Sequence, residues 1–442
     1  MPSTSPDRPL RFIHAADLHL DAAFKGIASD APASVRTALQ RATFTAFHHL
    51  VELGCRLQPD FLVLAGDIYN QEDGSLKAQL TLRDGCMRLR EAGVRVFIAH
   101  GNHDPYSSRA ASITLPDNVT VFGTDAVDVV EVPRNNDLVA VVHGISHATA
   151  RERKSLARKF NRTLHDTVQI GVLHCTLDAV ASADIYAPAT LKELSATGLD
   201  YWALGHIHEP QQVSRTPLVV YPGSTQGLHI NEQGLHGCMV VEGDRHTLQA
   251  EIFPLASVVW KKIEVDITGH ETAERLDDAL FAAADNALAE SLEACDAAGK
   301  PWSITPAAPE GMVLRITLTG RGPLDTLLRA PGTLPDLLER LRESLAVQSP
   351  FIWIKDIELV CRPDADMDAQ RRRPDLLGET LRMALALKND NDDVATHFSE
   401  ALAPMFDKPK LRKAIDPPDA EELLHLLEEA ELLCMDMLEA DQ

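Results

Sequence analysis

The chain has 442 residues, of which 45% are hydrophobic and 24% charged, and its formal net charge is -23. This size and apolar content fit a multidomain protein with one large domain and one or two smaller ones. The acidic balance argues against nonspecific nucleic-acid binding by the whole surface, because such binding neutralises phosphates with Lys and Arg. A nucleic acid would have to meet a local basic patch, bound metals or a partner.

No apolar stretch reaches the roughly 18 residues of a membrane helix, and the first residues lack the layout of a signal peptide. We therefore expect a soluble, cytoplasmic protein with no membrane association. The 7 cysteines lie far apart, without a C-x-x-C pair. This spacing predicts reduced, buried thiols and neither a zinc ribbon nor a disulfide framework.

Between residues 11 and 255, short β-type runs alternate with helical stretches, which predicts an α/β domain. Helices are expected at residues 34–55, with Ser34 as a candidate N-cap, and at residues 74–92. Five predicted strands lead directly into polar loops; they cover residues 12–13, 61–65, 94–98, 168–173 and 201–204.

Each of these five strands ends at side chains that can bind a metal ion. The segments are Asp17-Leu18-His19, Gly66-Asp67, Gly101-Asn102-His103-Asp104, His174 and Gly205-His206-Ile207-His208. Because open α/β sheets place their ligands at the carboxyl ends of the strands, we expect these side chains to converge. Asp, His and Asn can hold two divalent cations close enough to split a phosphoester. The pattern therefore predicts a two-metal phosphoesterase.

The types of ligand limit which metal ions can bind. Carboxylate and neutral imidazole suit Mn²⁺, Fe²⁺ or Zn²⁺, and the hard amide oxygen of Asn102 favours Mn²⁺ or Fe²⁺. Asp67 is the candidate bridge between two cations. Taken singly, Asp17, Asp67 and Asn102 would be ordinary turn or cap residues, and only their combination with four histidines favours a metal site. The other strand-end histidines, at positions 14, 100, 143 and 147, are expected to be structural or exposed.

After Pro254 the alternation of apolar and polar residues indicates a different arrangement of strands and helices. Strands are expected at residues 260–267, 313–318 and 351–354, and helices at 271–293 and 334–345, which fits a small α+β domain over residues 256–361. The polar residues 362–374 predict a linker, and residues 375–442 are expected to be helical. The last helix carries an apolar stripe on an acidic surface, which either docks on the body of the protein or binds another helix. The stripe consists of Leu423, Leu426, Leu427, Ala430, Cys434, Met437 and Leu438.

The motifs D-x-H, G-D, G-N-H-D, a single His and G-H-x-H resemble those of the calcineurin-like metallophosphoesterases. The segments 14–21 and 221–227, with Gly237, resemble more specifically the SbcD-type DNA repair exonucleases, most closely their bacterial YhaO branch. The resemblance covers residues 10 to 265. It implies a short N-terminal extension (1–10) and a four-layer α-β-β-α sandwich (11–255). An α+β capping domain and a helical C-terminal tail would follow.

The resemblance also implies two sets of metal ligands that share one carboxylate. These are Asp17, His19, Asp67 and His208 for one cation, and Asp67, Asn102, His174 and His206 for the other. A hydroxide between the two cations, most simply Mn²⁺, would attack the phosphorus in line. His103 would act as general acid or orient the phosphate, and Asp104 would orient His103.

One position departs from the pattern of the resemblance. DNA-cutting relatives carry a His three residues after the bridging Asp, and this chain has Asn70. An amide can still donate a hydrogen bond to a phosphate, but it cannot carry charge or transfer a proton. A basic strip from Arg151 to Arg162 is either a track for a nucleic-acid backbone or a solvated helix face.

The leading hypothesis is a Mn²⁺-dependent DNA exonuclease or endonuclease that works with an SbcC-like or YhaN-like coiled-coil ATPase. The resemblance alone implies that partner, and it also admits a homodimer. Two alternatives stay open: a phosphodiesterase or phosphatase for small substrates, and a weakly catalytic adaptor for the ATPase. The domain after residue 255 favours the nuclease, and the intact G-N-H-D segment speaks against the adaptor.

Overall fold

The structure is a computed structural model that describes residues 8–24, 31–70, 74–107, 113–135, 137–178, 185–364, 366–388 and 420–440. The chain divides into two compact units. One unit comprises Met1–Thr319 and Leu327–Val360, and the other comprises Gly320–Thr326 and Cys361–Gln442.

Two six-stranded sheets form the first part of the larger unit, here called the two-sheet domain (residues 8–255). The first sheet has the order β12 (Gln249–Pro254), β11 (Gly237–Gly243), β1 (Leu10–Ala15), β2 (Phe61–Ala65), β3 (Arg95–Ala99), β4 (Val119–Val121). The second has the order β5 (Asp128–Arg134), β6 (Asp137–Gly144), β7 (Val168–His174), β8 (Tyr201–Gly205), β10 (Leu218–Tyr221), β9 (Gln211–Arg215). The four strands β1 to β4 are parallel, and so are β6, β7, β8 and β10. Each sheet therefore has one edge where several carboxyl ends meet.

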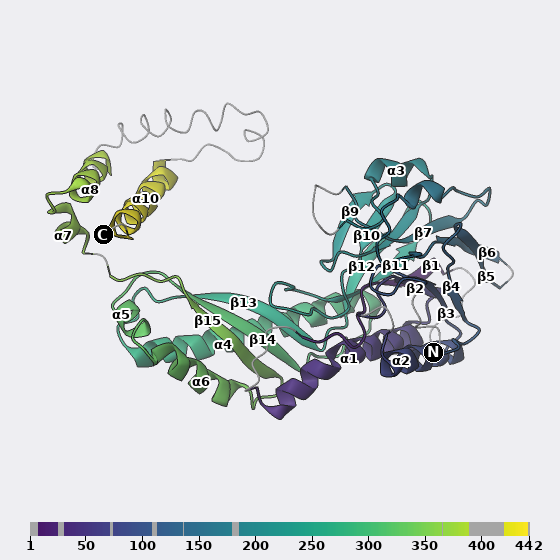
Figure 1. Cartoon of the computed structure of the whole chain (residues 1–442), viewed down its shortest axis with the longest axis horizontal. Helices are drawn as coiled ribbons and strands as arrows, with labels where there is room; N and C mark the ends of the chain where they lie inside the picture. Colours follow the sequence, from purple (N-terminus) through teal and green to yellow (C-terminus); the bar gives the residue numbers. More distant parts are fainter. Residues whose placement is uncertain are drawn as a thin grey trace. The chain divides into compact units, whose positions relative to one another are not determined.

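The layers follow from strands that are apolar on both faces. In β2, Phe61 and Val63 face the second sheet, whereas Leu62 and Leu64 face the helices. Strands buried on both sides read as continuous apolar runs, as this one does. Helices α1 (Ala33–Leu57) and α2 (Leu76–Glu91) cover the outer face of the first sheet (Figure 1).

Aromatic rings fill the space between the two sheets. Phe12 stacks on Phe61 with ring centroids 4.9 Å apart, and the edge of Tyr201 meets Phe12 at 5.1 Å. The outer layer on the second sheet is thin, because it contains only η1 (Ala157–Lys159) and α3 (Leu191–Ala196) among the described residues. The order is nonetheless α-β-β-α, as predicted.

The two large helices differ in how they begin. The predicted N-cap of α1, Ser34, is wrong: the helix begins at Ala33, after Pro32, and no side chain caps it. Pro32 precedes the helix with a ψ of 152°, which is extended, so the first helical residue comes before Ser34. In α2 the side chain of Ser75 accepts a hydrogen bond from the Ala78 main-chain N–H, an ordinary N-cap.

The middle domain (residues 256–360) contains three parallel strands that alternate with helices. They are β13 (Val258–Asp266), β14 (Gly311–Thr319) and β15 (Phe351–Leu359), and the connections hold α4 (Ala273–Gly299), η2 (Lys300–Trp302), α5 (Leu324–Leu328) and α6 (Thr333–Leu345). Every strand and helix predicted in this stretch is present. Helices α4 and α6 lie along the same face of the sheet (Figure 1).

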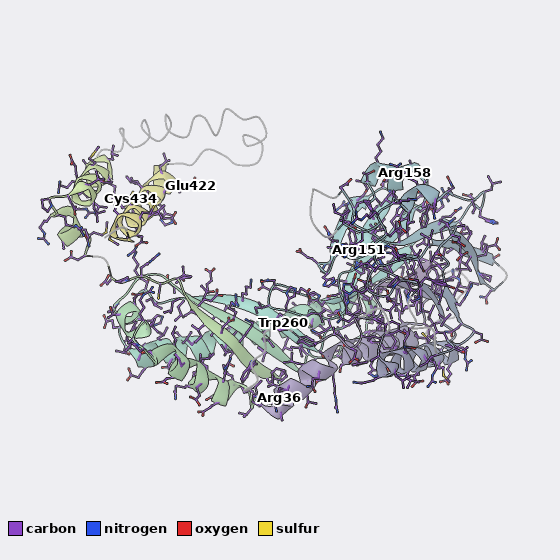
Figure 2. The ribbon with its side chains drawn as sticks, viewed as in Figure 1. Arg36, Arg151, Arg158, Trp260, Glu422 and Cys434 are labelled. Carbon is purple, nitrogen blue, oxygen red and sulfur yellow. The ribbon has the colours of Figure 1, made fainter. Side chains whose placement is uncertain are left out.

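The opposite face of the middle sheet packs on the two-sheet domain at one end. Trp260, labelled in Figure 2, is buried with Val313 and Trp353 against Val35 and Leu39 of α1. The indole N–H of Trp260 also donates to the Gly227 carbonyl at 2.7 Å. Burial of this aromatic cluster joins the two domains in one compact unit.

The smaller unit is helical, with α7 (Met367–Arg371), α8 (Leu376–Lys388) and α10 (Ala420–Ala440). The expected linker over residues 362–374 therefore includes a short helix, which Asp366 caps through the Ala369 N–H. Of the predicted helical tail, residues 389–419, between α8 and α10, lie outside the described residues. No helix among the described residues has the length and apolarity of a membrane span.

The apolar stripe of the last helix is divided between packing and exposure. Leu423 and Leu427 pack with Ala384 of α8, and Lys388 pairs with the buried Glu431 at 2.6 Å. Met437, which the stripe also includes, is 64% exposed. Docking on a neighbouring helix thus accounts for one side of the stripe.

Candidate metal centre

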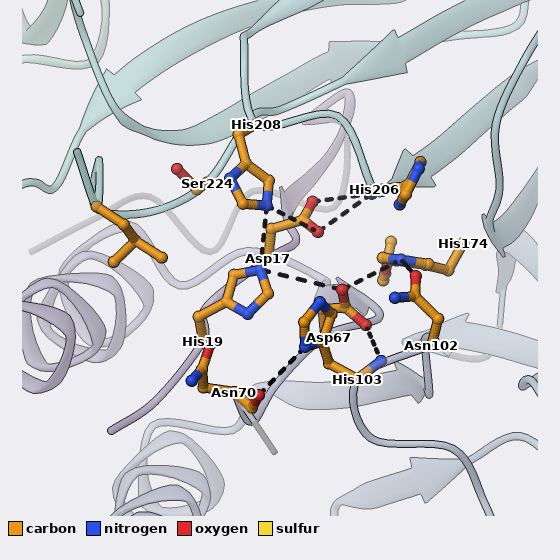
Figure 3. Close-up of polar contacts among 12 residues, drawn as sticks. Asp17, His19, Asp67, Asn70, Asn102, His103, His174, His206, His208 and Ser224 are labelled. Carbon is orange, nitrogen blue, oxygen red and sulfur yellow. Dashed lines mark hydrogen bonds and ion pairs between the residues drawn. The ribbon is translucent and has the colours of Figure 1, made fainter. Parts of the chain in front are cut away.

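The predicted ligands converge where the carboxyl ends of the parallel strands of the two sheets lie together. Their loops follow the carboxyl ends of β1, β2 and β3 in one sheet and of β7 and β8 in the other. Figure 3 shows the side chains gathered around one point; they are Asp17, His19, Asp67, Asn102, His174, His206 and His208. The parallel strands account for this convergence, because each delivers its loop at the same edge.

Four of these residues have a backbone conformation that L-amino acids rarely adopt. The φ angles are 50° at Asp17, 41° at His19, 50° at Asp67 and 109° at His206. Such strain persists only where the surroundings impose it, and it clusters at functional sites. Here the loops after β1 and β2 hold each other: the Asp17 N–H donates to Gly66 O at 3.1 Å and the His19 N–H to Asp67 O at 3.0 Å.

The first ligand group contains Asp17, His19 and His208, whose ligand atoms all lie within 4.8 Å of one another. Nε2 of His208 is 3.1 Å from Nε2 of His19 and 4.0 Å from Oδ1 of Asp17. The Nδ1 of His208 donates to Glu232 Oε1 at 2.8 Å, so its Nε2 keeps a lone pair towards this group. The buried Nδ1 of His19 has no hydrogen-bond partner within the described part of the chain.

The second ligand group contains Asp17, Asp67 and His174. The Nδ1 of His174 donates to the Ala65 carbonyl at 2.9 Å, which turns the lone pair of Nε2 towards Asn102 Oδ1 at 3.0 Å and Asp67 Oδ2 at 3.4 Å. Three lone pairs that converge in a buried place repel one another unless a positive charge lies among them. These donors therefore fit a divalent cation.

The pKa shifts of the buried ligands also indicate that this site favours a positive charge. Burial lowers the pKa of His174, but the Asp67 carboxylate outweighs burial and raises it to about 9. Burial alone would raise the pKa of Asp67, yet His174 and His19 hold it well below its usual range. Burial raises the pKa of Asp17 to about 6. A bound cation would take the place of the proton that His174 otherwise holds.

Asp67, the predicted bridge, belongs to the second group and also lies near His19 of the first. Its Oδ2 is 3.4 Å from His174 Nε2 and 3.9 Å from His19 Nε2. Asp17 belongs to both groups by distance, whereas the resemblance assigns it to one cation only. Among the described residues His206 belongs to neither group; its ring lies 5.3 Å from that of His174, and its main-chain N–H donates to Asp17 Oδ2 at 3.0 Å.

His103 lies beside the ligands and is exposed, with its ring 5.0 Å from that of His19. Its Nδ1 donates to the main-chain carbonyl of Asn70 at 3.1 Å. The His103 ring is therefore oriented by the Asn70 carbonyl, and the prediction that Asp104 orients it is wrong. The buried Asp104 accepts from the N–H groups of Ile68 and Gly101, both at 2.9 Å, and from His100 Nδ1 at 3.2 Å.

Asp104 therefore shapes the loop and does not touch the reacting region. A carboxylate that is fully buried is stable only when such donors surround it. Asn70, predicted to bind substrate through its amide, contributes its carbonyl to His103. The remaining strand-end histidines are structural, as expected for His14, whose nitrogens lie 2.9 Å from Tyr201 OH and 3.1 Å from Leu204 O.

Sequence reasoning missed Glu232. It accepts from His208 Nδ1, yet it lies 24 residues away in a loop with no motif. His147 was expected to be structural or exposed, but its contact with the metal centre was not foreseen: its Nε2 donates to the His174 carbonyl at 2.6 Å. No local signal marks either contact, because each residue reaches its partner only through the fold.

Three side chains of the basic strip are engaged by neighbouring residues. Arg158 pairs with Glu193 at 2.5 Å and Arg162 with Asp200 at 2.8 Å, and Lys159 Nζ donates to the Asp125 carbonyl at 3.1 Å. Arg158 lies beside α3, away from the three-stranded sheet (Figure 2). These contacts favour the solvated-surface interpretation over a dedicated track for nucleic acid.

Known proteins place this site in a family. The calcineurin-like phosphoesterase family matches residues 10–210, and the middle domain of the metallophosphoesterase YhaO matches residues 260–362. An uncharacterized metallophosphoesterase YhaO of Bacillus subtilis is 34% identical over 346 residues, which cover 78% of this chain and 80% of that protein.

More distant relatives are named for DNA repair or for nuclease activity. The DNA double-strand break repair protein Mre11 of Aeropyrum pernix is 26% identical over 276 residues, 58% of this chain and 64% of that protein. A component of the nuclease SbcCD of Bacillus subtilis is 24% identical over 259 residues, 51% of this chain and 64% of that protein. The chain belongs to the calcineurin-like metallophosphoesterases, in the branch of YhaO and the SbcD-type proteins, and is thus a metal-dependent phosphoester hydrolase of a family that uses dimetal centres.

Proposed function

We propose that the chain hydrolyses phosphodiester bonds in DNA, as a repair exonuclease or endonuclease, with two divalent cations that are Mn²⁺ by preference. The observation that carries the proposal is the position of His103, an exposed imidazole held beside two groups of candidate metal ligands. Relatives named for DNA repair and for nuclease activity support DNA as the substrate.

The contacts of each residue indicate its role in the proposed reaction. The seven side chains that converge after β1, β2, β3, β7 and β8 would hold the cations, with Asp67 between them. Two bound divalent cations supply an activated water and neutralise the charge of the phosphate. Oxygen and imidazole ligands, with an amide from Asn102, favour Mn²⁺ or Fe²⁺ over softer metals.

His103 would act on the leaving group. Its Nδ1–H is donated to Asn70 O, so Nε2 is the ring atom available to the substrate. In its protonated form His103 can donate from Nε2 to the departing oxygen, and in either form it can hold a phosphate oxygen in place. The main-chain N–H of His103 donates to Asp67 Oδ1 at 2.9 Å, which holds the main chain of His103 beside the carboxylate proposed as the bridge.

We also propose that a coiled-coil ATPase is the partner and that it binds the C-terminal helices. Leu376 and Met383 of α8, and Leu433 and Met437 of α10, are exposed apolar side chains on this unit. Such side chains suit an interface with another helix. Deletion of residues 375–442 should spare metal-dependent hydrolysis and abolish capture of the ATPase. Continued capture would show that these helices are merely structural.

The experiment that tests the substrate is a Mn²⁺ titration of the purified chain with labelled single-stranded and double-stranded DNA, alongside bis(p-nitrophenyl) phosphate. Metal-dependent cleavage of DNA supports the proposal. Hydrolysis of the small diester without cleavage of DNA would favour a phosphodiesterase for small substrates. No turnover of any substrate, with metals bound, would favour the adaptor.

A further inference from the structure

The loop that follows β10 connects the metal centre with the middle domain. Glu232, in this loop, is a side chain of low exposure whose Oε1 accepts the Nδ1–H of His208 at 2.8 Å. Its other oxygen, Oε2, accepts the main-chain N–H of Leu228 at 2.6 Å. Both carboxylate oxygens are therefore in use. Oε1 contacts His208 and also lies 3.2 Å from His229 Nε2 of the same loop, and Oε2 contacts the main chain of the loop.

The hydrogen bond to Glu232 determines which nitrogen of His208 can coordinate a cation. An imidazole coordinates a cation through one nitrogen only when the other carries the proton, and a carboxylate acceptor on the far nitrogen fixes that tautomer and the angle of the ring. With Glu232 on Nδ1, the Nε2 of His208 faces His19 and Asp17. Without Glu232, the ring could rotate or present the wrong tautomer.

The same loop is fastened to the first strand of the middle domain. The Lys262 main-chain N–H donates to Gln233 Oε1 at 2.8 Å, and the Lys262 ammonium donates to Asn231 Oδ1 at 2.8 Å. The residues on both sides of Glu232 thus hold one residue of β13. The indole of Trp260, two residues earlier in the strand, donates to Gly227 O at the start of the loop.

We propose that Glu232 is a positioning residue for the metal ligand His208, and that the loop Gly227–Gly234 makes the affinity of that metal position depend on the middle domain. The inference rests on the metal-dependent function proposed above. It adds a residue outside the ligand set and a physical route, from β13 through Asn231, Glu232 and Gln233 to His208. A displacement of β13 should change the affinity of the metal position near His208 more than that of the position near His174. The reason is that His174 contacts Ala65 and Asn102 instead.

The test is calorimetric titration of Mn²⁺ into the full metal-free chain, which reports two affinities independently of turnover. Glu232→Gln should weaken one site by about tenfold or more, as loss of a carboxylate behind a metal-bound His usually does, and leave the other unchanged. Glu251→Gln, at an exposed glutamate of β12, is the matched control. Retention of both affinities in Glu232→Gln would overturn the role of Glu232.

A double-mutant cycle separates positioning from general damage to the loop. In a His208→Ala background the further change Glu232→Gln should have no effect on either affinity, because its target is gone. A tenfold loss that persists in that background would overturn the route through His208. If the unaltered chain bound no Mn²⁺ at all, the proposed function would fail together with this inference, whereas failure of the variants alone leaves the proposed function standing.

The link to the middle domain has its own pair of variants. Lys262→Met removes the ammonium that holds Asn231 and keeps the aliphatic stem, and it should weaken the same site about threefold, within the usual range of such couplings. Lys261→Met is the control, since Lys261 points to Glu290 on α4 at 2.6 Å. Equal affinities for Lys262→Met and the unaltered chain would overturn the dependence on the middle domain.

Discussion

His103 and Asn70 form a hydrogen bond from the imidazole Nδ1 to the main-chain carbonyl, 3.1 Å long. A carbonyl can only accept, so this bond fixes the tautomer of His103 whatever side chain residue 70 carries. The amide at position 70, which departs from the pattern of DNA-cutting relatives, therefore leaves the orientation of His103 intact.

Replacement of His103 by Ala should lower the turnover number by about 10²- to 10⁴-fold, the usual contribution of a positioned acid or phosphate-binding group. The metal content should stay at that of the unaltered chain, because His103 is not needed as a ligand. Steady-state kinetics with metal analysis would measure both. His246→Ala, at an exposed turn, is the control, and loss of metal in His103→Ala would reject the acid role.

Replacement of Asp104 by Asn should act on stability. The carboxylate accepts from Ile68 N–H, Gly101 N–H and His100, and an amide has one acceptor oxygen where two are needed. We expect a loss of about 2 kcal/mol or more in the free energy of unfolding, measured by denaturant titration. The control is Asp137→Asn, at an exposed position. Unchanged stability with lost turnover would instead restore Asp104 as the residue that orients His103.

Much of the fold could be predicted because its strands are apolar on both faces and end in turn-forming polar residues. The continuous run at 61–65 marks a strand buried between a helix layer and a second sheet, and Asp67 follows where the strand must end. The same logic locates His174 and His206. The side chains converge because parallel strands share an edge, which is a property of topology that periodicity reveals.

What could not be predicted depends on contacts between distant residues. Proximity in sequence pairs Asp104 with His103, but a buried carboxylate goes where the main-chain donors are, and these come from residues 68 and 101. Glu232 reaches His208 across a loop that no motif marks. Residue type alone favours Ser34 as an N-cap, although the helix already begins at Ala33 and no side chain caps it.

Replacement of Gly101 by Ala should disturb the carboxylate of Asp67, the proposed bridge. A Cβ at this position would lie 2.2 Å from Asp67 Oδ1 and 2.8 Å from Asp67 N, so the Asp67 loop must move. Overpacking of this kind costs about 1 to 3 kcal/mol, and we also expect weaker Mn²⁺ binding by calorimetry. Gly123→Ala is the control, because its Cβ would meet only Asp128 Oδ2, at 3.4 Å. Unaltered Mn²⁺ affinity in Gly101→Ala would contradict a central position for Asp67.

Acid should destabilise the metal-free protein partly through His14. Burial lowers the pKa of His14 from 6.5 to about 3, so between these pH values the unfolded chain binds a proton that the folded chain refuses. Stability is therefore lost as the pH falls from 6.5 towards 3, with no further loss from His14 below that. The slope attributable to this residue is at most about 1.4 kcal/mol per pH unit.

His14→Gln should remove that slope, since an amide can bond to both Tyr201 OH and Leu204 O without titrating. Denaturant unfolding in a chelator, at several pH values between 4 and 6.5, compares the two proteins. A slope in the variant as steep as in the unaltered chain would show that His14 is not the group responsible.

The most direct measurement of the central claim is anomalous diffraction from crystals of the chain grown with Mn²⁺. Two peaks about 3.5 to 4 Å apart should lie at the ends of β1, β2, β3, β7 and β8, one next to Asp17 and His208, the other next to Asn102 and His174, with Asp67 between them. The absence of any peak at this edge, or manganese bound only elsewhere on the chain, would contradict it.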